Sequence, residues 1–217
     1  IKSFFRRRFS YYFATRIEFL RSSDSWFRPA AIRTGPDGAM YVADLYRLVI
    51  EHPEWIDDTL EKEMIADGRL RAGHDKGRIY KIFPDSVKLH KKANLAGKGP
   101  QALAKLMDSP NGWQRDTAHM MLTWLDKEEQ KKAIPNLHQV LNSQFPAARA
   151  QALSALNDLD SLWSKAMQKG LEDKHSGVRR NALRVGGVLL NQTSELGQMV
   201  VTLLDDEDAH VQRRAAY

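Results

Sequence analysis

The feature that most constrains this 217-residue chain is a repeat in its second half. Four segments, "LMDSPNGWQRDTA", "LNSQFPAARAQA", "LEDKHSGVRRNA" and "LDDEDAHVQRRA", each carry a leucine, a polar loop and a small or apolar residue seven positions later. The leucines are spaced by 35, 30 and 33 residues, as are the later positions: Leu106, Leu141, Leu171 and Leu204, then Trp113, Ala148, Val178 and Val211. An amphipathic stretch precedes each leucine, so the pattern predicts stacked helical hairpins, an α-solenoid.

Two of the four segments carry a recognisable helix opening. "VRRNA" (Val178–Ala182) has the pattern V-R-x-x-A, and "VQRRA" (Val211–Ala215) has it nearly, whereas "WQRDT" and "AARAQA" depart from it. The pattern resembles the second helix of short, bacterial-style HEAT repeats. The resemblance implies three repeats plus a truncated fourth over residues 99–217, after a linker at 85–98.

The first half carries the signals of short strands rather than of helices. "RPAAIRT" is a strand candidate, and "GPDG" follows it with turn chemistry. "AMYVADLY" has apolar residues on both faces, "RLVI" is a candidate third strand, and "GRIYKIF" is a candidate closing strand. Between the last two, "WIDDTLEKEMIADG" predicts a helix with Asp58 as its N-cap and Glu61 as the capping-box partner.

Four short antiparallel strands with two apolar faces are typical of one β-propeller blade, and we expect one over residues 16–84. The fold class expected is therefore α+β in two segregated parts, a partial β-propeller followed by an α-solenoid of HEAT-like repeats. A lone blade cannot bury both of its faces. We therefore expect the chain to be a piece of a longer protein, with residues 1–15 as an unplaced basic and aromatic segment.

Five motifs in the first half occur in an order that suggests a family: "SDSWFRP" (Ser23–Pro29), "GPDGAMYVADLYR" (Gly35–Arg47), "VIEHPEWI" (Val49–Ile56), "LRAG" (Leu70–Gly73) and "GRIYKI" (Gly77–Ile82). They resemble the last propeller blade of bacterial membrane-bound or periplasmic dehydrogenase-like proteins, whose propeller is similar to that of glucose and sorbosone dehydrogenases. The resemblance implies HEAT repeats next and often a c-type cytochrome domain further on.

The same resemblance implies a cofactor, partners and a location. It implies pyrroloquinoline quinone with calcium in the parent protein, haem c in a downstream domain and no cofactor within this chain. It also implies the remaining propeller blades as partners and a periplasmic or membrane-associated protein. Because the chain has no cysteine, it cannot itself carry the C-x-x-C-H haem attachment.

The strongest candidates for chemistry follow the "AMYVADLY" strand. Asp44, Arg47, Glu51 and His52 combine two carboxylates, a guanidinium and an imidazole, which could bind a polar substrate or accept a proton from a hydroxyl. The alternative is structural, with Arg47 and Glu51 as an ion pair and His52 capping a loop. Asp57, Asp58 and Asp67 lack calcium-loop spacing, and the histidines lack zinc-site spacing.

Charge is uneven along the chain. The net charge is +6, and residues 1–35 carry eight basic and two acidic residues, so the remainder is neutral. The basic end interleaves arginine with aromatic residues, but no second patch accompanies it, and we expect no nucleic-acid partner. No window of the sequence is long and apolar enough to span a membrane.

Arginines open successive second helices of the predicted repeats and have two interpretations. They could form a partner-docking stripe, or each could pair with an acidic loop residue such as Asp108, Asp173 or Asp206: Arg115, Arg149, Arg179, Arg180, Arg213 and Arg214. Tryptophans and methionines at helical spacing are expected in the core: Trp113, Trp124, Trp163, Met107, Met120, Met121 and Met167.

Two functions follow from these observations. The first is a fragment of a dehydrogenase-like protein that oxidises a sugar or alcohol and passes electrons towards a c-type haem, with the repeats as a spacer or docking surface. In that case we expect the isolated chain to be inactive. The alternative is a non-catalytic HEAT-repeat scaffold for protein–protein interaction.

Overall fold

The structure, a computed structural model, describes residues 19–50, 52–89, 94–187 and 194–217. The chain divides into two compact units, Ile1–Leu89 and His90–Tyr217. Residues 1–15, expected as a basic and aromatic segment, lie outside the described residues. Among the described helices, none has the length and apolarity that a membrane span requires.

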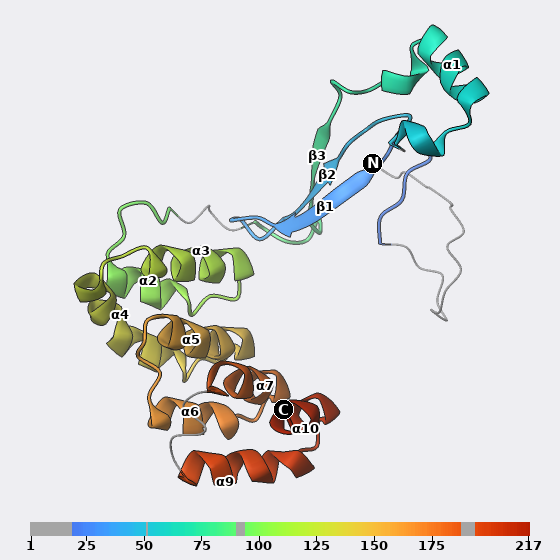
Figure 1. Cartoon of the computed structure of the whole chain (residues 1–217). Coiled ribbons are helices and arrows are strands. Elements are labelled where there is room, and N and C mark those ends of the chain that lie inside the picture. The colour runs from blue at the N-terminus through green and yellow to red at the C-terminus, as the bar shows by residue number, and fades with distance from the viewer. Residues whose placement is uncertain (1–18, 51, 90–93, 188–193) are drawn as a thin grey trace. The chain divides into compact units, whose positions relative to one another are not determined.

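The first unit contains a three-stranded antiparallel sheet in the order β1-β2-β3 (Figure 1). The strands are β1 (Pro29–Thr34), β2 (Met40–Asp44) and β3 (Arg78–Ile82), with Val42 paired to both Ile32 and Tyr80. The "GPDG" turn joins β1 to β2. Its Gly38 has φ 84°, and Asp37 accepts the Ala39 N–H, so the turn is built from the residues that favour it.

The predicted propeller blade is wrong. The described part of this unit has three strands, and "RLVI" forms none of them. After Asp44 the chain bends, because Tyr46 takes the left-handed conformation (φ 47°) and donates its N–H to Asp44 Oδ1. Strand β2 therefore pairs with β3 rather than with the segment that follows it, and the chain as a whole is dominated by helices.

A helical excursion lies between β2 and β3. It comprises η1 (Pro53–Trp55), α1 (Asp58–Ala66) and η2 (Arg69–Arg71). The N-cap is Asp57 rather than the expected Asp58, since the Asp57 side chain accepts the N–H groups of Thr59 and Leu60.

The second unit is an array of helices that pair in sequence order. Its elements are α2 (Pro100–Leu106), α3 (Gly112–Thr123), α4 (Lys127–Val140), α5 (Pro146–Asp158), α6 (Ser164–Leu171), α7 (Ser176–Val185), α9 (Ser194–Thr202), η3 (Leu203–Asp205) and α10 (Ala209–Ala215). Helix α2 packs on α3 and α4, α6 packs on α7 and α9, and α5, α7 and α10 follow one another in a second row (Figure 1).

One apolar cluster runs through this array. Ala118, Ala152 and Ala182 are fully buried on α3, α5 and α7. The small side chain of Ala182 lets α7 approach α6 closely, since a Cβ on Gly170 of α6 would lie 2.9 Å from the Ala182 Cβ. The three alanines are spaced by 34 and 30 residues, so the motif in α3 begins at Gln114 and not, as the sequence alignment placed it, at Trp113.

Candidate functional site

Asp44, the first of the predicted catalytic residues, is buried at the end of β2, with 3% of its surface exposed. Its Oδ1 accepts the N–H groups of Arg28 at 2.7 Å and Tyr46 at 2.9 Å. These bonds fasten the segment before β1 to the bend after β2. Its Oδ2 is also buried but has no hydrogen-bonding partner. One oxygen therefore has a structural role, and the other is available to a donor that the described residues do not supply.

Aromatic and charged side chains surround the Tyr46 bend. The Tyr46 hydroxyl donates to Asp24 Oδ2 at 2.8 Å, and the Arg78 guanidinium lies 3.4 Å from the Tyr46 ring centroid. Trp26 packs on the same ring at a centroid distance of 5.6 Å. Hydrogen bonds from the Trp26 backbone and the Tyr46 hydroxyl lower the pKa of Asp24. The bend is thus held by the "SDSWFRP" and "GRIYKI" motifs together.

Gly73 of the "LRAG" motif completes this enclosure. It has φ 88°, and a Cβ there would lie 2.4 Å from the Tyr46 carbonyl oxygen. The Leu48 N–H donates to the Ala72 carbonyl at 3.4 Å. The motif is therefore explained by close backbone approach, with no catalytic role needed.

No hydrogen bond or ion pair joins Asp44 to Arg47 or His52, the two other predicted catalytic residues that the structure describes. Arg47 is half-buried, and its buried Nε has no partner among the described residues. Glu51 lies outside the described residues, so its pairing with Arg47 stays a prediction. His52 is exposed, and its Nδ1 lies 3.8 Å from Glu54 Oε1.

The residues present do not fit the cofactors that the family resemblance implies. The candidate calcium carboxylates are already engaged: Asp57 caps α1, and Asp67 pairs with Arg69. The described residues contain no group of three potential metal ligands. A tricarboxylate quinone needs several cationic partners, and near the Tyr46 bend Arg28 donates to the Leu48 carbonyl while Arg78 covers the Tyr46 ring.

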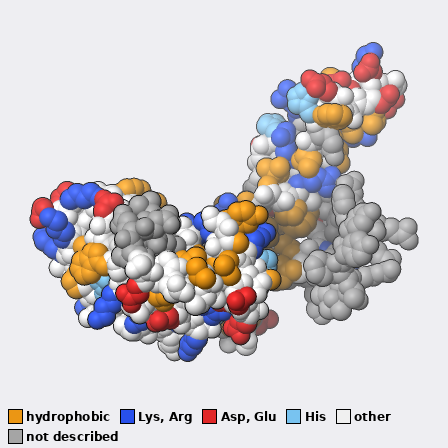
Figure 2. All heavy atoms as spheres, turned by 60° about the horizontal axis from the view of Figure 1, so that its bottom comes forward, with side chains coloured by type: hydrophobic (Ala, Val, Ile, Leu, Met, Phe, Trp, Pro, Cys, Tyr) orange, Lys and Arg blue, Asp and Glu red, His pale blue; other side chains and the backbone are white. Residues whose placement is uncertain are grey.

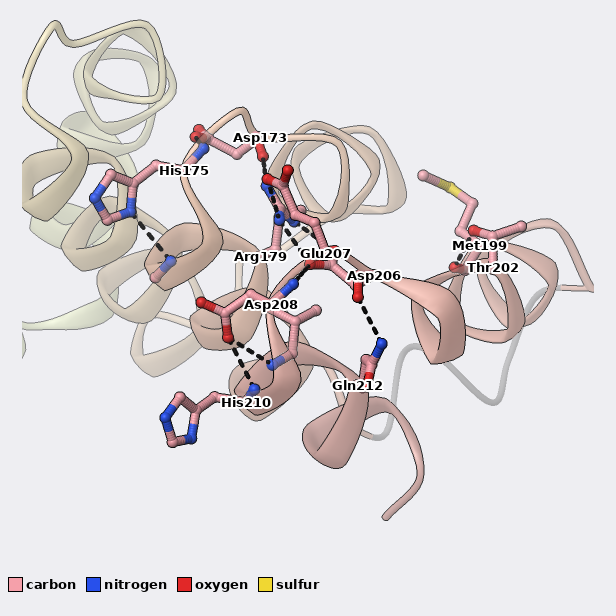
Figure 3. Close-up of polar contacts among 12 residues, drawn as sticks. Asp173, His175, Arg179, Met199, Thr202, Asp206, Glu207, Asp208, His210 and Gln212 are labelled. Carbon is pink, nitrogen blue, oxygen red and sulfur yellow. Dashed lines mark hydrogen bonds and ion pairs between the residues drawn. The ribbon is translucent and has the colours of Figure 1, made fainter.

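In the helical unit, two of the predicted docking arginines are buried in a repeated ion pair. Arg179 donates through Nε and Nη2 to both oxygens of Asp206 at 2.7 Å, and through Nη1 to the Asp173 carbonyl at 2.8 Å (Figure 3). Arg149 makes the same contacts one repeat earlier, to Asp173 at 2.6 and 2.7 Å and to the Ser143 carbonyl at 2.8 Å. Both guanidinium groups are therefore used inside the array.

The pairs also shift the acidity of the loop carboxylates. Burial alone would raise the pKa of Asp173, but the hydrogen bonds from Arg149 hold that pKa below its ordinary value. The hydrogen bonds from Arg179 likewise lower the pKa of Asp206. Both carboxylates are ionised at neutral pH and are structural partners of the arginines.

The remaining four arginines differ in environment. Arg115 occupies the position equivalent to Arg149, and its Nη1 donates to the Ser109 carbonyl at 2.7 Å. The loop residue that would supply its carboxylate is Ser143, so its Nε binds Gln151 Oε1 at 3.1 Å instead. Arg180, Arg213 and Arg214 are exposed and remain candidates for partner contact.

Sequence reasoning missed a groove between α3 and α5. It has a volume of about 270 Å³ and is lined by Asp116, His119, Met120, Thr123, Gln151 and Asp158. Gln151 Nε2 donates to Asp116 Oδ1 at 2.9 Å. His119 Nε2 lies 3.1 Å from Asp158 Oδ2, but without hydrogen-bonding geometry, so this contact is electrostatic.

Met120, which lines this groove, and Trp124, four residues further along the chain, are exposed, contrary to the expectation that they belong to the core. Trp124 is 72% exposed and Met120 is 44% exposed, whereas Met107 and Met167 are fully buried. Asp116, Met120 and Trp124 recur every four residues and so lie on one side of α3. Exposed hydrophobic side chains are visible on both units in Figure 2. Helical spacing alone could not separate the exposed positions of α3 from its buried ones, because α3 packs on helices of its own and of the next hairpin.

Residues 6–86 match the model of a family described as a domain of unknown function (DUF7133). The match falls within the first unit and includes all three strands of its sheet. No curated protein and no solved structure matches the chain.

Proposed function

We propose that the chain is an interaction module whose helical unit binds a protein partner at the groove between α3 and α5. The observation that carries the proposal is the exposure of Trp124, the C-cap of α3, four residues after the groove-lining residue Met120. Tryptophan and methionine are enriched at protein interfaces, and tryptophan is among the residues that most often dominate binding energy.

The array offers a larger hollow, of about 660 Å³, between the α4–α5 loop and α6. Part of its lining is used within the protein, since Arg149 is paired with Asp173 and Lys169 donates to Asn142. Its only large apolar residue is Leu141, which is buried, whereas the α3–α5 groove has the exposed Met120 in its lining.

The proposal is tested by selecting peptides from a random display library on the full chain. Selected peptides should lose about thirtyfold or more in affinity on Trp124→Ala, since truncation of an interface hot spot costs about 2 kcal/mol or more. Trp163→Ala is the matched control, because Trp163 is 59% exposed but lies at the start of α6, a helix that contributes no residue to the groove. Peptides equally sensitive to both changes, or to neither, would contradict the proposal.

Oxidation of a sugar or alcohol stays a prediction of the family resemblance. One feature favours a polar ligand in the first unit: Asp44 Oδ2 and Arg47 Nε are both buried without partners. Titrating sugars and alcohols against the amide signals of residues 44–48 in an NMR spectrum would test it. Shifts abolished by Arg47→Gln would support a ligand site, and an unchanged spectrum would contradict it.

A further inference from the structure

The charge of the residues that line the α3–α5 groove indicates which partner segment it binds, and this inference rests on the interaction site proposed above. Its lining includes the carboxylates of Asp116 and Asp158 and no lysine or arginine. Asp116 uses Oδ1 to accept from Gln151, and no contact of its Oδ2 with another described residue is seen. Both aspartates are exposed. The groove therefore presents negative charge to an incoming group.

The apolar part of the same surface lies at a fixed offset from this charge. Met120 is one helical turn and Trp124 two turns beyond Asp116, so eight residues at 1.5 Å each place the two ends about 12 Å apart. An arginine side chain cannot pair with Asp116 and cover Trp124 at once. Two side chains of the partner are needed, one cationic and one apolar.

An extended segment supplies that spacing. Residues i and i+4 of a strand point to the same side and are separated by about 13 Å. Arginine suits the charged position better than lysine, because its planar guanidinium can pair with a carboxylate through two parallel hydrogen bonds. We infer that the groove binds an extended segment of a protein partner that carries an arginine and, four positions away, a large apolar residue.

Among the described residues, no lysine or arginine forms an ion pair with Asp116 or Asp158. Arg115 donates to the Ser109 carbonyl and to Gln151, which in turn donates to Asp116, so its charge lies near Asp116 but does not contact it. Lys127 pairs with Asp160 at 2.7 Å. The His119 ring lies 3.1 Å from Asp158 Oδ2 and so occupies that side of the groove, whereas Asp116 Oδ2 has no contact with another described residue, and Asp116 is the preferred partner.

The inference is tested with three peptides and the full chain labelled at the methionine methyl groups. The first is acetyl-Gly-Arg-Ser-Ala-Ser-Leu-Gly-amide; the second has citrulline, the neutral isostere, in place of arginine; the third has serine in place of leucine. Titrations are followed by the Met120 methyl signal in low salt. The first peptide should bind about three- to fivefold more tightly than the citrulline peptide, the range expected of an exposed ion pair.

Two variants locate the effect. Asp116→Asn should abolish the difference between the arginine and citrulline peptides, whereas Asp85→Asn, which removes an exposed charge from the first unit, should leave it unchanged. Equal binding of the arginine and citrulline peptides to the unaltered chain would overturn the inference. If library peptides still depend on Trp124 in that case, the proposed function stands without it; if no peptide shifts Met120 and none depends on Trp124, both fail.

Discussion

The substitution Arg149→Met probes the repeated ion pair most directly. Methionine retains the length and most of the apolar stem of the arginine but removes the three hydrogen bonds made by Nε, Nη1 and Nη2. It leaves the Asp173 carboxylate, which is 8% exposed, without a cation. Removing one partner of a buried pair costs about 3 to 5 kcal/mol, largely because a charge is left buried and unpaired.

Arg115→Met provides the internal comparison. Arg115 occupies the equivalent position, but its side-chain partner is the neutral Gln151. Its removal should cost only about 1 to 2 kcal/mol, because no charge is stranded. Urea unfolding of the full chain, followed by tryptophan fluorescence, measures both free energies of unfolding from midpoints at constant slope.

The comparison has a clear refuting result. If Arg149→Met costs no more than Arg115→Met, the Asp173 carboxylate is not dependent on its arginine and the reasoning fails. A double variant, Arg149→Met with Asp173→Leu, should recover part of the loss, since replacing both charges by apolar groups removes the stranded one. No recovery would show that the loss comes from packing rather than charge.

Three further predictions follow. Acid should destabilise the helical unit, because Asp173 and Asp206 have folded pKa values below their unfolded value of about 3.9. The stability that their ion pairs contribute is present above that value and is lost as the pH falls through the folded pKa values. The urea midpoint should therefore drop between about pH 5 and pH 2, and it should drop less in Arg149→Met. Gly170→Ala should cost about 1 to 3 kcal/mol by the same assay, because its Cβ would lie 2.7 Å from Leu153 Cδ1 and 2.9 Å from Ala182 Cβ, whereas Gly112→Ala, with Arg115 Nη2 at 3.5 Å, should cost nothing; equal costs would contradict the packing argument. Asp44→Asn should preserve hydrogen-exchange protection of the Arg28 and Tyr46 amides, because an amide oxygen can still accept both, and Asp44→Ala should remove it; protection lost in both would assign Asp44 a role that needs its charge.

The positions of the helices in the second half were predictable from the sequence, because the contacts that define each helical hairpin join residues close together in the chain. Alanines that are fully buried on α3, α5 and α7 recur in the sequence, and the leucine spacing reports the hairpin length. The sequence alignment of the first repeat was nevertheless displaced by one residue, because the equivalent positions there are defined by a hydrogen bond and not by residue type. Arg115 reaches back six residues to the Ser109 carbonyl, as Arg149 reaches the Ser143 carbonyl, and this fixes Ser109, not Asp108, as the equivalent of Ser143.

The first half was less predictable because its strand pairing depends on a single bend. The apolar run "RLVI" satisfies the sequence criteria for a strand, but Tyr46 in a left-handed conformation redirects the chain before it. The candidate site was affected in the same way. Asp44 and Arg47 lie near the bend, and His52 follows it into the helical excursion. The exposed Trp124 was missed because residue spacing gives the face of a helix but not whether another element covers that face.

The arginine pairs have a consequence for how such an array can change in length. The Ser109, Ser143 and Asp173 carbonyls each accept from the arginine of their own repeat, and the Asp206 carbonyl accepts from Gln212 at the same position. Where the loop residue is an aspartate, its carboxylate accepts from the arginine of the previous repeat. A duplicated repeat such as residues 171–203 would therefore bring both halves of the connection with it. Its aspartate would receive the preceding arginine and its own arginine would reach the next aspartate, so the array could lengthen by copying without any new complementary surface.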